Sequence, residues 1–167
     1  AKKIGDYKII GETRDDAVGE AFDKVARMLG LPYPGGPSIS ALAEIARTDA
    51  DLTQTNADRI KLPRPMINSG DFDFSFAGLK TAVLYKLKEL EKKNFGDVPR
   101  QFRVSPRLKK EMALEFENAS TEVLISKTKK ALLKTKAKTL IIGGGVSANI
   151  NIRREFAKLV KEDLKSV

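Results

Sequence analysis

A chain of 167 residues with 41% apolar side chains can bury a hydrophobic core, and its length fits one domain or one lobe of a larger enzyme. The absence of cysteine and histidine excludes disulfide bonds, thiolate nucleophiles, and histidine as a metal ligand or general base. The formal net charge of +9 fits a partner rich in phosphate, although solvated lysine-rich helix faces would produce the same excess.

The first predicted elements are a strand and a helix. Residues 7–10 predict a short strand that leads into a glycine. Thr13 is expected to begin a helix, with Asp16 as its capping-box partner three residues later. Apolar residues then recur at helical spacing as far as Leu29, and Gly30 ends the helix.

Proline, glycine and polar residues separate the next elements. The run 31–37 predicts a turn, and a second helix is expected through residues 42–46. The polar residues 49–58 predict an exposed excursion. From 71 to 76, phenylalanine alternates with polar residues, which predicts a strand with one buried face. An amphipathic helix is expected from Gly78 onward.

The last third of the chain predicts two more helices and a strand. Ser105 followed by Pro106 is a helix cap with proline at the first helical position, so a long helix should begin there. Residues 139–142 predict a buried strand, 143–145 a tight glycine turn, and Ser147 the cap of a final helix. Together these elements predict an α/β, helix-rich fold.

The first predicted helix carries three carboxylates at spacings of four and then three residues, on Asp16, Glu20 and Asp23. Residues so spaced share one helix face, so they could accept hydrogen bonds from a ligand's hydroxyls or face a cation. Gly19 within this helix costs about 1 kcal/mol against alanine, which close approach of another group would explain. The alternative is a solvated acidic face that forms salt bridges with nearby lysine and arginine.

Two glycine-rich segments could present bare backbone to a ligand. Residues 33–37 combine rigid prolines with open glycines, although an ordinary turn between helices has the same composition. Residues 139–149 predict a strand, a glycine turn and a helix N-terminus, which favours an anion or a nucleotide. Asn149 could donate and accept hydrogen bonds there. A dinucleotide G-x-G-x-x-A pattern also matches, but no second strand with an acidic residue follows.

Several segments follow one known family in order and spacing. Residues 11–27 resemble the long signature of the tRNA N6-adenosine threonylcarbamoyltransferase family, formerly labelled O-sialoglycoprotein endopeptidases or glycoproteases. The family's Leu-Gly-Leu-x-Tyr-Pro-Gly-Gly-Pro turn is similar to residues 29–37. Its later motifs resemble Pro-Arg-Pro-Met at 63–66, Phe-Ser-Phe-Ala-Gly-Leu-Lys-Thr-Ala at 74–82, where alanine replaces the usual serine, and Gly-Gly-Val-Ser-Ala-Asn at 144–149. The residues in these motifs resemble those of bacterial members of the family.

The resemblance implies a fold and a reaction. The fold would be part of the two-lobed actin/Hsp70/sugar-kinase-like architecture, with residues 1–63 at the end of the first lobe and 64–167 at the start of the second. The reaction would transfer a threonylcarbamoyl group from threonylcarbamoyl-adenylate to N6 of the adenosine beside the anticodon in tRNA. The implied nucleotide ligand is threonylcarbamoyl-adenylate, ATP or ADP. The implied partners are tRNA and the companion proteins of the threonylcarbamoyladenosine-forming complex.

Position by position, the resemblance implies a nucleotide site. Asp23 and Gly36 correspond to pocket residues at the nucleotide's sugar, and Asn149 to a pocket residue near the adenosine. The glycine corner adds Gly144 and Gly145. Further candidates for ordering the helix start or lining the pocket floor are Glu12, Asp16 and Glu20.

The resemblance also implies iron or zinc, held by an HxxxH pair upstream and an aspartate downstream of the segments matched here. Because the chain has no histidine, we expect no metal site and no catalytic residue in it, and no transferase activity from it alone. One alternative is a nucleotide-, tRNA- or partner-binding module without catalysis. Another is a metallopeptidase, after the old glycoprotease label. With no long apolar run or signal segment, we expect a cytoplasmic protein without a membrane partner.

Overall fold

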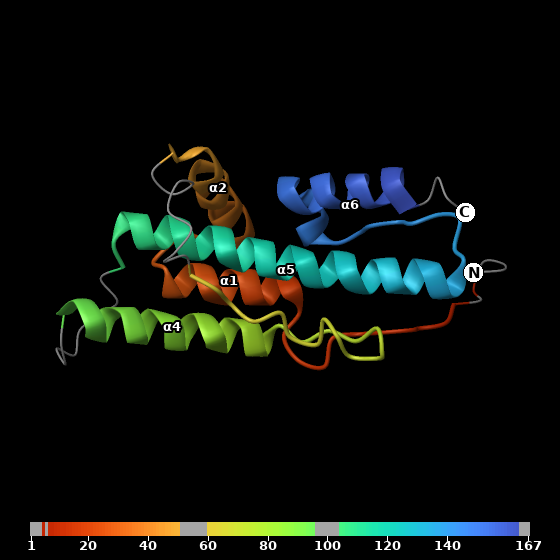
Figure 1. Cartoon of the computed structure of the whole chain (residues 1–167), viewed down its shortest axis with the longest axis horizontal. Helices are drawn as coiled ribbons and strands as arrows, with labels where there is room; N and C mark the ends of the chain where they lie inside the picture. Colours follow the sequence, from red (N-terminus) through yellow and green to blue (C-terminus); the bar gives the residue numbers. More distant parts are fainter. Residues whose placement is uncertain (1–4, 6, 51–59, 96–103, 164–167) are drawn as a thin grey trace.

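The computed structural model describes residues 5, 7–50, 60–95 and 104–163. In this part of the chain the regular elements are helical (Figure 1): α1 (Val18–Met28), α2 (Gly35–Thr48), α4 (Ala77–Phe95), α5 (Pro106–Thr135), the short 3-10 helix η1 (Gly145–Ala148) and α6 (Ile150–Asp163). The long helix α5 runs across the middle of the view in Figure 1, with α4 below it and α2 and α6 above it, and α2 packs against both α5 and α1. The helix-rich prediction is therefore confirmed.

Helix α1 begins at Val18, so the predicted start at Thr13 is wrong. The Thr13 hydroxyl donates to the backbone oxygen of Asp16 at 2.9 Å, which forms a turn. The carboxylate of Asp16 accepts from Lys24 and from Lys80 on α4, each at 2.8 Å. A capping box would need that carboxylate to bind the backbone at Thr13. The ammonium groups of Lys24 and Lys80 bind the Asp16 carboxylate instead, and α1 begins two residues after Asp16.

The strongest helix boundary signals in the sequence are confirmed. The Ser105 hydroxyl accepts from the backbone N–H of Leu108 at 3.2 Å, and Pro106 is the first residue of α5. Helix α1 ends at Met28, and Gly30 after it has a φ of 65°, the left-handed conformation that glycine adopts without strain. The helix expected from Gly78 begins one residue earlier.

The first turn of α2 differs from the predicted boundary. Helix α2 begins at Gly35, inside the segment predicted as a turn, and Pro37 is its third residue. Proline is tolerated there because the first backbone N–H groups of a helix have no partner within the helix. The predicted excursion 49–58 lies almost wholly outside the described residues.

The predicted strands do not form a sheet in the described residues. The only strand-like pairing there is an isolated parallel bridge between Thr13 and Phe74. In the segment predicted as a buried strand, Ile141 is 88% exposed, and Ile9 in the first predicted strand is 78% exposed. A strand needs a neighbour for its backbone N–H and C=O groups, and these segments have none beside them here. The β part of the α/β prediction is thus not seen in the residues that the structure describes.

One hydrophobic core joins the first and last parts of the chain. Phe22 of α1 and Phe116 of α5 lie at its centre, with ring centroids 4.9 Å apart in an edge-to-face arrangement. The core includes side chains from both sides of the expected 63/64 boundary, so the two expected portions pack against each other in the described residues. A smaller cluster fixes α6 on the C-terminal half of α5 through Ile152 and Phe156.

Ionic contacts hold the segment between α2 and α4 against α5. Lys127 of α5 is fully buried, and its ammonium donates to Ser69 and to the backbone and side chain of Asp71. The guanidinium of Arg64 binds the carboxylates of Glu115 and Glu122 on the same helix. In the described residues, no helix is long and apolar enough to cross a membrane.

Candidate functional site

A cavity of about 1000 Å³ opens between the start of α1, the start of α2 and the loop before α6. A space of this size accommodates a small molecule or a cofactor. It is lined by residues of all three segments: Ala17, Val18, Gly19, Phe22, Asp23, Pro34, Gly36, Pro37, Ser40, Ala41, Glu44, Gly143, Gly144, Gly145, Val146, Ala148, Asn149 and Ile150. The structure therefore brings Asp23, Gly36, Gly144, Gly145 and Asn149 to one cavity, although they are far apart in the sequence.

Asp23 lies where α1 meets the start of α2. Its Oδ1 accepts from the backbone N–H of Gly35 at 2.8 Å. A Cβ atom on Gly35 would lie 2.6 Å from the Cα of Asp23 and 2.7 Å from the Cβ of Ala26, so only glycine allows this approach. The bond to Gly35 fixes the carboxylate at the cavity wall. Its second oxygen keeps its capacity to accept from a ligand.

Gly36 faces the cavity instead of the neighbouring helix. A Cβ atom on Gly36 would meet no other atom within 4 Å, so the missing side chain leaves open space at the start of α2. Gly19 contributes in a different way. A Cβ there would lie 3.3 Å from the Cγ2 of Val146, so this glycine lets η1 lie close to α1. The cost of a glycine at position 19 predicted that another group lies close to this helix. That group is Val146 of the protein itself.

The glycine corner forms a turn and a 3-10 helix before α6 begins. Gly144 has a φ of 85°, and its backbone oxygen accepts from both the N–H and the hydroxyl of Ser147, at 3.1 and 2.7 Å. Ser147 therefore closes the turn and does not cap α6, contrary to the prediction. A Cβ at Gly144 or Gly145 would meet nothing within 4 Å, which leaves the backbone of this corner open to the cavity.

Asn149 is the side chain that caps α6. Its Oδ1 accepts from the backbone N–H of Ile152 at 2.9 Å, the bond expected of an N-cap residue. Its Nδ2 donates to the Oε1 of Glu117 at 2.6 Å. Glu117 is buried in α5, and its Oε2 accepts from Arg47 of α2 at 2.6 Å. The amide of Asn149 is thus held from two sides at the edge of the cavity.

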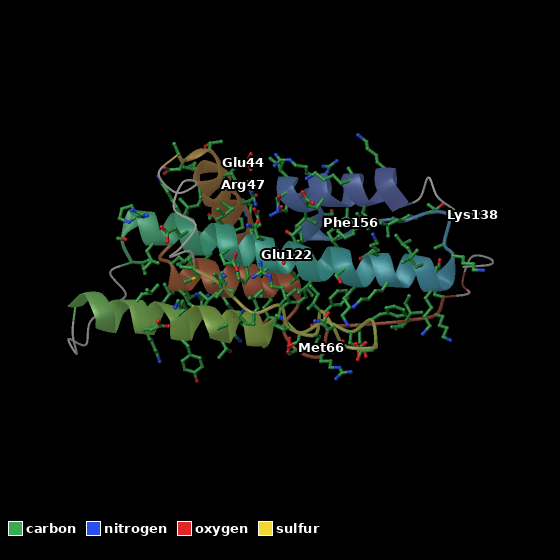
Figure 2. The ribbon with its side chains drawn as sticks, in the orientation of Figure 1. Glu44, Arg47, Met66, Glu122, Lys138 and Phe156 are labelled. Atoms are coloured by element: carbon green, nitrogen blue, oxygen red, sulfur yellow. The ribbon has the colours of Figure 1, made fainter. Side chains whose placement is uncertain are left out.

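Arg47 also connects this polar contact to Glu44, which lines the cavity. Glu44 lines the cavity, accepts from Arg47 at 3.1 Å, and lies 3.5 Å from Arg154 of α6. Hydrogen bonds with Arg47 hold the pKa of Glu44 below its usual range. Figure 2 shows Glu44 and Arg47 on the side of α2 that faces the first turn of α6. Sequence reasoning missed Glu117, although a glutamate directly after the core residue Phe116 on an apolar helix face was a usable signal.

The remaining acidic candidates lie outside the cavity lining. Asp16 binds two lysines, and these hydrogen bonds lower its pKa. Glu20 pairs with Lys24 at 2.8 Å, as the alternative of a salt-bridged face predicts. Glu12 contributes its backbone, which bonds to Asp73 and Phe74. Asp16 precedes the first residue of α1, and its carboxylate and that of Glu20 bind the same ammonium group of Lys24.

Asp15 connects two of the sequence motifs. Its Oδ1 accepts from the backbone N–H groups of Phe76 and Ala77, at 2.8 and 3.0 Å, and its Oδ2 accepts from the hydroxyl of Ser75. Burial raises the pKa of Asp15, but these hydrogen bonds outweigh it and the net shift is downward. The carboxylate thus caps α4 and fixes the segment before α1 to the segment before α4.

Metal ligands do not cluster in the part of the chain that the structure describes. The sequence has no histidine or cysteine, and among the residues that the structure describes no three acidic side chains are grouped as metal ligands.

The fold and site define a helical unit with a cavity of small-molecule size, which has a glycine-rich corner and a fixed amide at its edge. The family model of the tRNA N6-adenosine threonylcarbamoyltransferases, TsaD, matches residues 1–167. The chain therefore belongs to the TsaD family, as its sequence motifs predict.

Curated relatives with this name come from several bacteria. The protein of Burkholderia mallei is 47% identical over 150 residues, which cover 90% of this chain and 39% of the relative. That of Neisseria meningitidis serogroup A is 45% identical over 157 residues, which cover 93% of this chain and 40% of the relative. The chain thus spans about 40% of the length of these relatives.

Proposed function

We propose that this chain is part of an enzyme that transfers a threonylcarbamoyl group from threonylcarbamoyl-adenylate to N6 of the adenosine beside the anticodon in tRNA. We also propose that its cavity holds the adenosine part of the nucleotide. One observation carries the second proposal: Asp23, Gly36 and Asn149, with the glycine corner, line a single cavity. These are the positions at which the family resemblance implies a nucleotide.

The chemistry of each lining group suits this ligand. The second oxygen of Asp23 can accept from a ribose hydroxyl, because only its Oδ1 is bound to Gly35. The bare Cα of Gly36 lets a sugar ring lie against the start of α2. A phosphate group or the base can lie close to the backbone of Gly144 and Gly145, because neither residue has a side chain that would fill this space. Asn149 can hydrogen-bond to the adenosine.

The extended segments support the proposed two-lobed actin/Hsp70/sugar-kinase-like architecture. Their apolar side chains are exposed, as at Ile9 and Ile141, and such segments would be buried by strands from the rest of a longer protein. In this proposal, residues 1–63 belong to the first lobe and 64–167 to the second. The matched relatives, of which this chain covers about 40%, have enough additional chain for this.

Other parts of the activity require groups that this chain does not contain. We propose that the iron or zinc ion is bound by residues of the whole enzyme that lie outside this chain, and that companion proteins and tRNA bind the whole enzyme in the cytoplasm. The chain alone should then form no product from threonylcarbamoyl-adenylate and unmodified tRNA. Product formed by the pure chain would contradict the proposal that the activity requires residues outside this chain.

Titration of the chain with ADP in a calorimeter tests the nucleotide site. We expect saturable binding that Asp23→Asn weakens by about tenfold. Asparagine keeps one oxygen for Gly35 but replaces the second with an NH2 group, which cannot accept from a ribose hydroxyl. Glu89→Gln on the exposed face of α4 is the matched control and should bind ADP like the wild type. No saturable binding, or equal binding by all three proteins, would overturn the proposal.

A further inference from the structure

We propose that Glu117 is a positioning residue, which fixes the side-chain amide of Asn149 so that one N–H of this amide is presented to the nucleotide. This inference rests on the nucleotide site proposed above and adds a residue to it. Glu117 does not line the cavity, so its effect on a ligand is indirect and passes through Asn149, the lining residue that it contacts.

The carboxylate of Glu117 is completely buried, yet both of its oxygens have partners. Its Oε2 accepts from Nη2 of Arg47 at 2.6 Å, and its Oε1 accepts from Nδ2 of Asn149 at 2.6 Å. A buried charge is costly unless it is paired and hydrogen-bonded. The guanidinium of Arg47 balances the charge of the carboxylate, which remains an ionised acceptor for the short hydrogen bond from Asn149.

These contacts determine which way the Asn149 amide points. The carboxylate of Glu117 can only accept a hydrogen bond, and the backbone N–H of Ile152 can only donate one. Nδ2 must therefore face Glu117 and Oδ1 must face Ile152, as the distances of 2.6 and 2.9 Å show. A flipped amide would place donor against donor and acceptor against acceptor, so both contacts would be lost.

The fixed amide has one N–H left for a ligand. An asparagine NH2 group has two hydrogens, and Glu117 takes one of them. Because Asn149 lines the cavity, the second N–H is a donor of defined direction at the cavity wall. The ligand atom that meets it must be a hydrogen-bond acceptor, such as a ring nitrogen of the base or a sugar oxygen. Glu117 thereby makes the site selective for an acceptor at this point.

The same contacts set the position of Asn149 relative to the rest of the cavity. Arg47 belongs to α2, Glu117 to α5, and Asn149 precedes α6, so three elements meet at this carboxylate. Helix α2 also carries Gly36 at its start. The distance between the two ends of the proposed nucleotide site therefore depends on the Arg47–Glu117–Asn149 contact.

The substitution Glu117→Gln tests this role. A glutamine can accept from Arg47 or from Asn149, but its NH2 group then faces a donor at the other contact. We expect ADP to bind at least tenfold more weakly. In ¹H–¹⁵N spectra of the chain, the Asn149 side-chain signals, assigned with Asn149→Asp, should move and exchange faster with water. Glu122→Gln is the control, because Glu122 lies on the same helix and pairs with an arginine but does not contact Asn149.

A double variant separates positioning from stability. In Glu117→Gln/Asn149→Asp, the glutamine NH2 can donate to the introduced carboxylate, and the glutamine oxygen can accept from Arg47. The introduced carboxylate can also cap α6 through Ile152, and the net charge is unchanged. We expect the melting temperature to return toward that of the wild type while ADP affinity stays at least tenfold weaker, because the side chain at position 149 has no N–H to donate.

The outcomes distinguish the two proposals. Wild-type affinity in Glu117→Gln, or recovery of ADP binding together with stability in the double variant, would overturn the positioning role and leave the nucleotide site standing. Absence of ADP binding by the wild-type chain would overturn the nucleotide site itself, and the role of Glu117 with it.

Discussion

Gly35 and Gly36 are adjacent in the first turn of α2, and alanine at each position should have opposite effects on stability. A Cβ at position 35 would lie 2.6 Å from the Cα of Asp23 and 2.7 Å from the Cβ of Ala26. Favourable carbon contacts are at about 3.5–4.0 Å, so α2 would have to move by about 1 Å from α1. A Cβ at position 36 would meet nothing within 4 Å.

The magnitudes follow from these contacts. Overpacking of a close-packed site costs about 1–3 kcal/mol, and movement of α2 would also weaken the 2.8 Å bond between Gly35 and Asp23. We therefore expect Gly35→Ala to lower the free energy of unfolding by about 2–4 kcal/mol, or about 6–12 °C in Tm. Gly36→Ala should raise it by about 0.5–1 kcal/mol, because alanine restricts the unfolded chain and fits a helix.

The assay combines thermal unfolding with ADP titration. Gly36→Ala should be more stable than the wild type and yet bind ADP more weakly, because its methyl group occupies open space at the cavity wall. A general loss of structure cannot produce that combination. Equal destabilisation by both substitutions would refute the packing argument, and unchanged ADP affinity in Gly36→Ala would refute the placement of the ligand beside Gly36.

Two further predictions concern carboxylates outside the cavity. Hydrogen bonds from Ser69 and Lys127 lower the pKa of Asp71 to about 2 from 3.8, so the stability it contributes is present above pH 3.8 and is lost as the pH falls toward 2. Urea unfolding between pH 5 and 2.5 should show a steeper loss in the wild type than in Asp71→Asn, and equal slopes would contradict this. Asp15→Ala should remove the cap of α4 and cost about 1 kcal/mol, or about 3 °C in Tm, whereas Asp15→Asn should retain most of it.

Local signals in the sequence predicted the helices well. The start of α5 at Pro106 and the end of α1 before Gly30 depend on residues that lie next to each other in the chain. Proline at a first helical position and glycine after a last one act through their own backbone dihedral angles. Such boundaries need no information about distant residues. The family membership was also predictable, because the motifs occur in order along the chain.

Long-range contacts decided the points at which sequence reasoning failed. Asp16 was predicted to cap a helix, but Lys80, distant in the sequence, binds its carboxylate. The segments 7–10 and 139–142 have apolar side chains suited to strands, yet a strand forms only beside a partner, and none lies beside them in the described residues. Pattern and propensity describe a segment by itself, whereas pairing depends on what folds next to it.

The candidate site also depends partly on local sequence and partly on long-range contacts. The sequence by itself determined the residue types, an acid at position 23, a bare glycine at 36 and an amide at 149, and the family resemblance marked them as a set. Only the tertiary structure decided that they line one cavity, because α1, α2 and α6 meet there through packing around α5. It alone revealed Glu117, since a buried carboxylate is defined by the partners that surround it, Arg47 and Asn149, which are far away in the chain.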